Sequence, residues 1–376
     1  MAAHMAAIFV LLLLLPVPSS SSHLTFKLNG HVYPGGYFYV TMEIGEKMYN
    51  LDVDTGSVLT WVQCHVPDCG RINCNTWKQP QKLYELEAGS DKHVPGTDQL
   101  CRALHSEPAP SDEQRCGYSI NYVVGSSHGF LIRDKFTLPI GRNVQKTIAF
   151  GCGYDQSGEE QEQPVDGILG LGRGSPVSLI SQLMKENIIT KDVIAHCISA
   201  DGGGFLHIGD YEHSSADGVR MNPKEKQGHY SPIVSAELNL KGTMIRNNMN
   251  VVTGSLGNSL TPVADTEFEL CWKGSNKFKS VGEVKSFFKP IFLIFRFGKK
   301  KATFDIPPEN YLFIKDGTVC FGILDGSRYS ALGNINVIGV ISMQNRVLIY
   351  DNVGGKISWV PDSCKIKSES VITSRL

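Results

Sequence analysis

Asp54, Thr55 and Gly56 are the first residues in this sequence whose types and spacing suggest chemistry. They interrupt a run of strand-forming residues that extends from Tyr49 to Cys64 (YNLDVDTGSVLTWVQC). Since Asp and Gly are poor strand residues, the pattern predicts a tight loop between two apolar strands. Such a loop would present one carboxylate at the edge of a rigid sheet, where it could act as a general base or acid.

The neighbours of Asp54 fit that role, but they also fit an ordinary turn. Thr55 and Ser57 can hydrogen-bond the loop and the carboxylate, and Gly56 lets a neighbouring backbone approach closely. Asp-Thr-Gly tripeptides also occur in turns by chance, so these residues alone leave both interpretations open. The longer context has to decide between a catalytic loop and a simple turn.

Longer segments of the chain favour the catalytic interpretation. The stretch around Asp54, with Ser57 after the glycine and Trp61 a few places further on, resembles the first catalytic motif of pepsin-like aspartic peptidases. The resemblance extends from about Gly36 to Cys364 and is closest to the plant nucellin-like aspartic proteinases. The segments that carry it are YPGGYFYVTMEIGE, IAFGCGYDQ, VDGILGLGRG, AHCISADGGGFLHIGD, LCWKG, IPPENYL and VLIYDN.

This resemblance implies both a fold and a reaction. The expected fold is mainly β and bilobal, with a cleft for an extended peptide or protein substrate between the lobes. In this family, water is activated between two carboxylates that share one proton, so that one serves as base and the other as acid. Asp54 would be one of them, and Thr55, Gly56 and Ser57 would support its loop. No cofactor and no metal are implied.

A second part of the cleft is expected between Cys116 and Leu138. This segment (CGYSINYVVGSSHGFLIRDKFTL) is rich in strand formers and has the turn residues Gly-Ser-Ser from Gly125 onward, so it predicts a β-hairpin. By resemblance the hairpin is the flap that closes over substrate, and Tyr122 matches the flap tyrosine, which would hydrogen-bond toward Trp61. Outside this family context, an ordinary hairpin with one aromatic residue would be the simpler interpretation.

The counterpart of Asp54 is missing from the second half of the sequence. No Asp-Thr-Gly or Asp-Ser-Gly lies in the interval 241–271. The nearest remnant is VVTGS, in which Val252 stands where the aspartate belongs. Asp265 follows two apolar residues and precedes a threonine, but Glu267 replaces the glycine. The interval is also short for the family, which indicates an internal deletion, and no second catalytic aspartate is assigned.

A single carboxylate has a chemical consequence. Asp54 alone cannot offer base and acid functions together, and each positioned group is worth roughly 10²–10⁴-fold. The sequence therefore predicts either a secreted endopeptidase of doubtful activity or an inactive binding or inhibitor protein that keeps the cleft. A site built from Asp54 of two chains is a third hypothesis, but the long second half would obstruct that pairing, and a monomer is expected.

The remaining segments predict the scaffold. The stretch 37–44 (YFYVTMEI) predicts a strand, and 65–115 has little periodicity and predicts a surface loop held by disulfides. By resemblance, the strand at 168–170 passes beneath the catalytic loop and braces it. Residues 178–187 predict a short helix, and Val-Ile-Gly at 337–339 is the expected counterpart of the bracing strand in the second half.

Residues 1–22 are expected to be a signal peptide, because the apolar run AAIFVLLLLLP is followed by four serines. The run is shorter than the roughly 20 residues that a membrane span needs. The mature protein is therefore expected in the secretory pathway, extracellular or vacuolar, with no membrane attachment. We expect an N-terminal lobe at 23–225, a truncated C-terminal lobe at 226–366 and a tail at 367–376.

Charge and cysteines narrow the class further. The formal net charge of -1 gives no electrostatic reason to expect a nucleic acid as partner. The 10 cysteines of a secreted β protein predict disulfides, and the metal-like spacing of Cys64, Cys69 and Cys74 lacks a histidine pair that would complete a zinc site. Spacing does not determine the pairing. As hypotheses, we expect Cys271 to pair with Cys320 in the second half and Cys197 with Cys364 between the halves.

Overall fold

The chain folds mainly into β-strands. The computed structural model describes residues 23–76, 82–105, 115–141, 143–158, 165–211, 213, 216–225, 228–240, 243–244, 259–326, 332 and 335–365. The predicted signal peptide, the predicted tail and Val252 lie outside these residues. In the part of the chain that the structure describes, no helix is long and apolar enough to cross a membrane. The lobe boundaries remain predictions.

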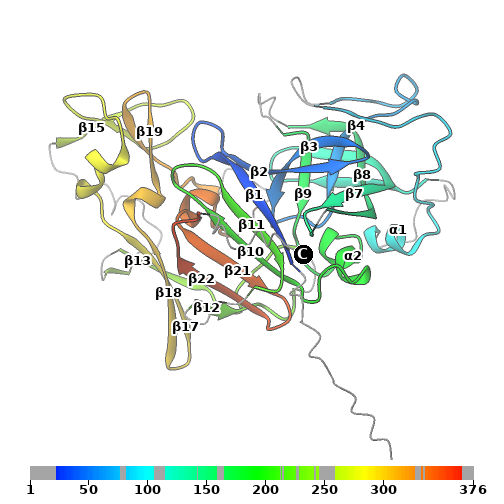
Figure 1. Cartoon of the computed structure of the whole chain (residues 1–376). Coiled ribbons are helices and arrows are strands. Elements are labelled where there is room, and N and C mark those ends of the chain that lie inside the picture. The colour runs from blue at the N-terminus through cyan, green and yellow to red at the C-terminus, as the bar shows by residue number, and fades with distance from the viewer. Residues whose placement is uncertain are drawn as a thin grey trace, which may run out of the picture.

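One sheet of 14 strands runs through the molecule, in the order β12-β22-β21-β10-β11-β1-β2-β3-β9-β4-β8-β7-β6 with β5 beside β4. Its strands from the first half lie at the right of Figure 1, in blue to green. They confirm the strands predicted at 37–44 and at 168–170. Their bounds are β1 His23–His31, β2 Tyr37–Ile44, β3 Lys47–Asp54, β4 Trp61–His65, β5 Tyr84–Glu85, β6 Gly117–Asn121, β7 Ser126–Leu138, β8 Val144–Ser157 and β9 Gly167–Gly170.

The last strands of the chain return to this same sheet. Two of them, β21 and β22, pair with β10 and β12, so the end of the chain closes onto its middle. In Figure 1 these strands lie between the first-half strands and the yellow strands at the left. Their bounds are β10 Val193–Ile198, β11 Gly204–Gly209, β12 Asp217–Arg220, β21 Arg346–Asp351 and β22 Lys356–Pro361.

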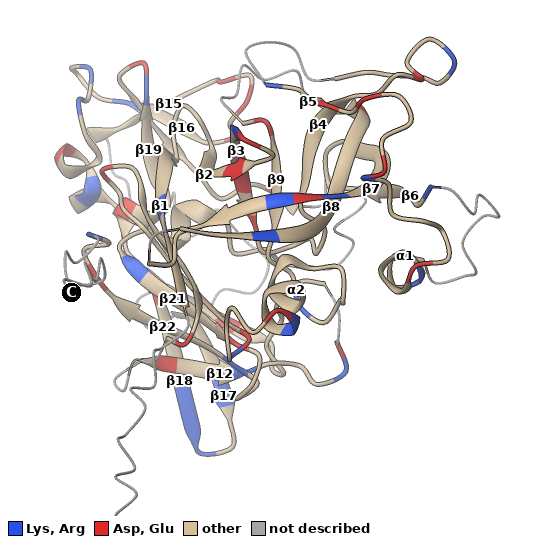
Figure 2. Cartoon of the chain, turned by 45° about the vertical axis from the view of Figure 1, so that its right-hand side comes forward, with Lys and Arg blue, Asp and Glu red and all other residues tan. Residues whose placement is uncertain are grey.

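Two sheets of four strands make up most of the described second half, in the orders β14-β13-β17-β18 and β15-β16-β20-β19. The turn between β17 and β18 and the start of β18 carry the lysines at 299–301, which form part of the blue hairpin at the bottom of Figure 2. The strand bounds are β13 Ala236–Leu240, β14 Thr243–Met244, β15 Thr261–Val263, β16 Cys271–Lys273, β17 Ile291–Phe297, β18 Lys300–Ile306, β19 Leu312–Lys315 and β20 Thr318–Phe321.

Helices are few and short. The predicted helix near 178–187 is confirmed as α2, Leu179–Lys185, and the Ser178 hydroxyl caps its first turn. Short 3-10 segments occur at Val281–Glu283, Lys285–Phe287, Pro308–Asn310 and Val340–Met343.

Five disulfides pair all 10 cysteines, and both hypothesised pairs, Cys271–Cys320 and Cys197–Cys364, are confirmed. Among the described residues, each group of three that could approximate a metal site contains two cysteines already joined to each other. Those sulfur atoms are therefore not available as thiolate ligands. The other pairs are Cys64–Cys152, Cys69–Cys74 and Cys101–Cys116.

Three sequence predictions need correction. The flap turn lies at 122–125, because Ser126 already pairs with Asn121 in the hairpin and the Tyr122 N–H bonds the Gly125 carbonyl. The region 65–115 is not all loop, since the short helix α1, Gln99–Leu104, forms behind the N-cap Asp98. Residues 337–339 form no strand, and Val337 is 66% exposed.

Candidate active site

The Asp54 loop is clamped to the strand that lies beside it. Strand β9 runs parallel to β3, with Asp54 opposite Gly170. Beyond the end of β9, the Leu171 N–H donates to the Asp54 carbonyl and the Gly172 N–H donates to the Ser57 carbonyl, each at 2.7 Å. A Cβ on Gly170 would lie 2.7 Å from the Leu59 carbonyl oxygen, so this close approach requires glycine. The predicted bracing of the loop is therefore present in the structure.

The Asp54 carboxylate is oriented by its own loop. Its Oδ1 accepts a hydrogen bond from the Gly56 N–H at 2.7 Å. A Cβ on Gly56 would come within 3.0 Å of that oxygen, which explains why a residue without a side chain occupies the position. The carboxylate is only partly buried, so it can still reach solvent or a bound ligand.

The flap contacts the same region through an aromatic pair. Trp61 Nε1 donates to the Tyr122 hydroxyl at 2.7 Å, as the resemblance implies. Trp61 is fully buried, and Tyr122 packs against the small apolar cluster that contains it. Burial and the nearby charge of Asp54 raise the pKa of Tyr122, so the phenol is neutral at physiological pH. Ser57 Oγ is buried close to this hydroxyl.

Aromatic residues from late in the chain support the loop from the other side. The Thr55 side chain interacts with the hydroxyl of Tyr350 on β21, which also lies 3.2 Å from His196 Nε2. The Tyr230 ring lies 4.4 Å from the Tyr350 ring, and its hydroxyl donates to the Leu171 carbonyl at 2.8 Å. Sequence reasoning missed this support. The only signal was that VLIYDN, which contains Tyr350, is one of the segments that carry the family resemblance.

Asp52 is a second carboxylate near Asp54 that sequence reasoning also missed. It lies two residues earlier on β3, and its Oδ1 accepts from the Phe38 N–H at 3.2 Å. Burial is the main cause that raises its pKa to about 7, and the charge of Asp54 contributes in the same direction. Two acidic residues thus lie close together on one strand (Figure 2).

Asp265, the acid with an imperfect motif, is engaged in its own turn. Its Oδ1 accepts from the backbone N–H groups of Glu267 and Phe268 at 2.9 and 3.0 Å, and it pairs with Lys315 at 3.0 Å. The two backbone hydrogen bonds and the lysine lower its pKa to about 2. These contacts give Asp265 a structural role, and the status of position 252 lies outside the described residues.

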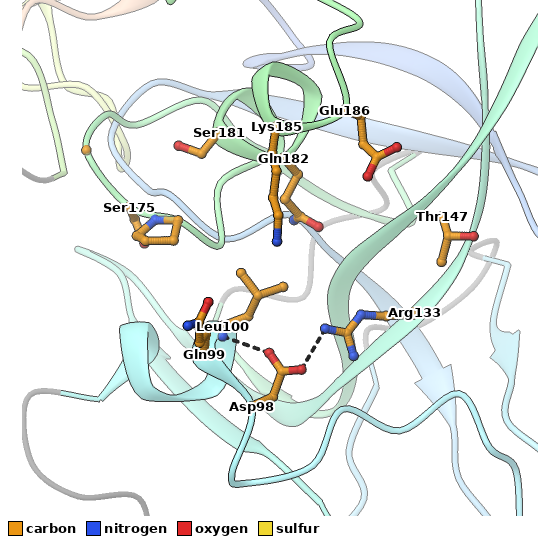
Figure 3. Close-up of a pocket in the computed structure, with 12 residues that line it drawn as sticks. Asp98, Gln99, Leu100, Arg133, Thr147, Ser175, Ser181, Gln182, Lys185 and Glu186 are labelled. Atoms are coloured by element: carbon orange, nitrogen blue, oxygen red, sulfur yellow. Dashed lines mark hydrogen bonds and ion pairs between the residues drawn. The ribbon is translucent and has the colours of Figure 1, made fainter.

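A separate hollow of about 910 Å³ lies between α1, α2 and strands β7 and β8 (Figure 3). Arg133 donates to Asp98 at 2.8 Å on one side, and Lys185 extends into the space from α2. Gln182 uses its amide to bond the backbone of Ala149 at 2.8 Å. None of the predicted site residues lines this hollow, so it is distinct from the Asp54 site.

Comparisons with known proteins agree with this geometry. Models of the xylanase inhibitor N-terminal and C-terminal families match residues 38–210 and 243–361. An aspartic proteinase of Oryza sativa subsp. indica is 41% identical over 426 residues, covering 100% of both chains. The chain belongs to the pepsin-like aspartic peptidase family. Aspartic proteinase 36 of Arabidopsis thaliana is 26% identical over 367 residues, covering 88% of this chain and 74% of the relative.

Solved structures support the fold. Basic 7S globulin from soybean has a TM-score of 0.65 at 13% identity, covering 91% of this chain and 97% of the globulin. The protein edgp has a TM-score of 0.61 at 13% identity, covering 92% and 96%. The fold is therefore the mainly β pepsin-like fold expected from the sequence. The alignment with the rice proteinase has 426 positions against 376 residues here, so at least 50 aligned positions (426 − 376) have no residue in this chain.

Proposed function

We propose that this protein is a secreted aspartic-type endopeptidase by descent, and that its cleft takes up extended peptides at Asp54. The observation that carries the proposal is the joint placement of three features. The Asp54 carboxylate is fixed by Gly56, its loop is braced by β9, and the Tyr122–Trp61 pair closes the flap side. A hydrolytic water held by Asp54 would face a peptide carbonyl in this arrangement.

Hydrolysis is expected to be slow in this chain. Asp54 can accept a proton from water, but peptide cleavage also requires an acid that protonates the leaving group and stabilises the oxyanion. The family uses a second aspartate for this purpose. The sequence contains one Asp-Thr-Gly and no Asp-Ser-Gly, and Val252 stands in the remnant of the second motif. Without the second group, roughly 10²–10⁴-fold of rate is missing.

A non-catalytic binding or inhibitor function is the second candidate. The loss of one catalytic motif, with the cleft elements of the first half intact, favours it. The family models that match the chain are named for xylanase inhibitors, and this name supports the inhibitor function as an alternative to cleavage. In this case the cleft, or a surface beside it, would hold a peptide or protein without cutting it.

The proposed setting is the secretory pathway, extracellular or vacuolar, with the protein acting as a monomer on a peptide or protein. Five disulfides suit an oxidising compartment. The apolar run in residues 1–22 supports entry into that pathway.

Restoring the second aspartate tests the choice between the two candidates. V252D converts VVTGS into VDTGS, and V252N is the matched control that adds a polar side chain without an acid. We expect V252D to raise the acid-pH cleavage rate of extended peptides by about 10²-fold or more, and V252N to leave it unchanged. A statine-type transition-state mimic should inhibit the gain.

One result would decide against the endopeptidase proposal, and another would correct only its requirement for a second aspartate. If V252D gains nothing while the wild type binds peptides or proteins tightly, the non-catalytic function is supported. If the wild type already cleaves peptides as fast as V252D, the requirement for a second aspartate at position 252 is wrong.

A further inference from the structure

Asp52 lies on the same face of β3 as Asp54. Successive side chains of a strand point to opposite faces, so Asp52 and Asp54 share one face while Leu51 and Val53 share the other. Leu51 is fully buried in the main core. Asp52, in contrast, is only partly buried. Val53 is partly buried as well and packs against that core, so the two aspartates lie on the face that points away from it.

The register across the sheet defines the surroundings of Asp52. It lies opposite Tyr39 on β2 and opposite Ile168 on β9. Both of these side chains are partly exposed, so the row is open along this part of the sheet. Ile168 in turn lies opposite Trp61 and packs against the apolar cluster that also contacts Tyr122. Asp52 thus belongs to a cross-strand row that runs from Tyr39 through Ile168 to Trp61, the tryptophan that bonds the flap tyrosine.

The Asp52 carboxylate has a partner for only part of its hydrogen-bonding capacity. Its Oδ1 accepts from the Phe38 N–H, and the Val53 N–H is a second backbone donor to the carboxylate. The charged neighbour that acts on it among the described residues is another acid, Asp54. A partly buried carboxylate next to a like charge is unfavourable unless a cation comes close. Within the described residues no lysine or arginine supplies that cation through an ion pair with Asp52.

These contacts indicate what kind of side chain would fit. Tyr39 and Ile168 provide apolar surface beside the carboxylate. A lysine or arginine side chain can lay its aliphatic stem on such a surface while its charged head pairs with an acid. Residues two apart on a strand are roughly 6.6 Å apart, so a peptide group over Asp54 brings a neighbouring side chain within reach of Asp52.

We propose that Asp52 is a specificity-determining residue, which selects a lysine or arginine side chain of the bound peptide next to the residue held over Asp54. This inference rests on the proposed peptide-binding cleft and names its substrate class. The alternative is that Asp52 only anchors the Phe38 backbone. Asn at position 52 distinguishes the two, because its amide oxygen can still accept that hydrogen bond but cannot pair with a cation.

The test measures peptide binding to the full chain in a D54N background, where cleavage does not interfere. Otherwise identical extended peptides carry Lys, Arg, Met or Glu at a single position, which is moved along the peptide. At pH 8, D54N is expected to bind the best-placed Lys or Arg peptide about tenfold more tightly than the Met peptide, and the Glu peptide most weakly. The D52N/D54N protein should bind Lys and Met peptides alike, with the Met affinity retained.

The D54N/D265N protein is the matched control, because it loses an acid outside the cleft and should keep the preference for Lys. Equal binding of Lys and Met peptides to D54N would overturn the inference while leaving peptide binding established. A Lys preference that persists in D52N/D54N would also overturn it. Failure of every peptide to bind both the wild type and D54N would instead contradict the proposed function, and the inference with it.

Discussion

Asp54 and Asp265 each directly follow an apolar residue and precede a threonine, yet the fold uses them in opposite ways. Asp54 ends strand β3, and one backbone N–H, from Gly56, orients its carboxylate. Asp265 follows β15, accepts two backbone hydrogen bonds and pairs with Lys315. One carboxylate is left accessible beside a flap, and the other is held in its ionised form by its own turn and by Lys315.

The residue two places later accounts for much of this difference. Gly56 has no side chain, and a Cβ there would come within 3.0 Å of Asp54 Oδ1. Glu267 instead extends its own carboxylate to Lys315 at 3.1 Å and strengthens the local ion pair. An Asp-Thr pair is therefore not enough to make a reactive loop. A glycine after it and a strand that braces it are also needed.

The largest effect should come from removing each acid in turn. In the V252D background, where cleavage is expected to be fastest, we expect D54N to lower the peptide cleavage rate by about 10²–10⁴-fold, because the remaining acid loses its base. D265N should leave the rate within about twofold, since its carboxylate is bound in a turn. Initial rates at acid pH, followed by mass spectrometry of the products, measure both. A comparable loss in D265N would mean that this turn contributes to the cleft.

The motif at Asp54 could be predicted because its signals are local. Strand formers on both sides of Asp-Thr-Gly gave the loop, and a second run of strand formers gave the hairpin that the family resemblance identifies as the flap. Helix α1 was missed because six residues are too few to show a helical period, although Asp98 is a good N-cap. Such a short helix is stable only through its packing and the Cys101–Cys116 bridge.

Features that depend on long-range pairing were not predictable from local patterns. Asp52 resembled an ordinary polar strand position, and its importance appears only when the register places it beside Tyr39 and Ile168. The contact of Tyr350 with Thr55 likewise joins residues from opposite ends of the chain. At 337–339 the apolar pattern suggested a strand, but Val337 is 66% exposed, so apolar composition alone was misleading.

Two acids should give pH dependences of opposite sign. The pKa of Asp52 is raised from 3.8 to about 7 in the folded state, so its contribution to stability is complete below pH 4 and is lost as the pH rises through 7. The pKa of Asp265 is lowered to about 2, so its contribution is present above pH 4 and is lost as the pH falls toward 2. In a plot of the free energy of unfolding against pH, D52N should therefore weaken the loss of stability as the pH rises through 7. D265N should weaken the loss of stability as the pH falls from 4 toward 2.

The contribution of Asp52 to the free energy of unfolding has an upper limit of about 4 kcal/mol, because folding raises its pKa from 3.8 to about 7. Water at the partly exposed carboxylate will reduce this contribution. Chemical unfolding at a series of pH values measures each variant against the wild type. Subtracting the wild-type free energy of unfolding at each pH cancels the effect of other groups that titrate in the same pH range. One such group is the buried His196, whose lowered pKa of about 4 makes acid destabilising for every variant. A D52N protein that is less stable than the wild type at pH 8 would show that the ionised carboxylate is favourably paired.

The smallest of these effects tests the bracing strand itself, with G170A and G339A as a matched pair. An alanine Cβ at Gly170 would meet backbone atoms of Leu59 and Val58 at 2.7–2.8 Å, and backbone cannot move aside as a flexible side chain can. Such overpacking costs about 1–3 kcal/mol. A Cβ at Gly339 would have no atom of the described residues within 4 Å, and the backbone there is extended, so alanine should change stability by less than about 0.5 kcal/mol. Urea unfolding compares the two. Equal costs would mean that 337–339 braces a loop in the second half as tightly as β9 braces Asp54.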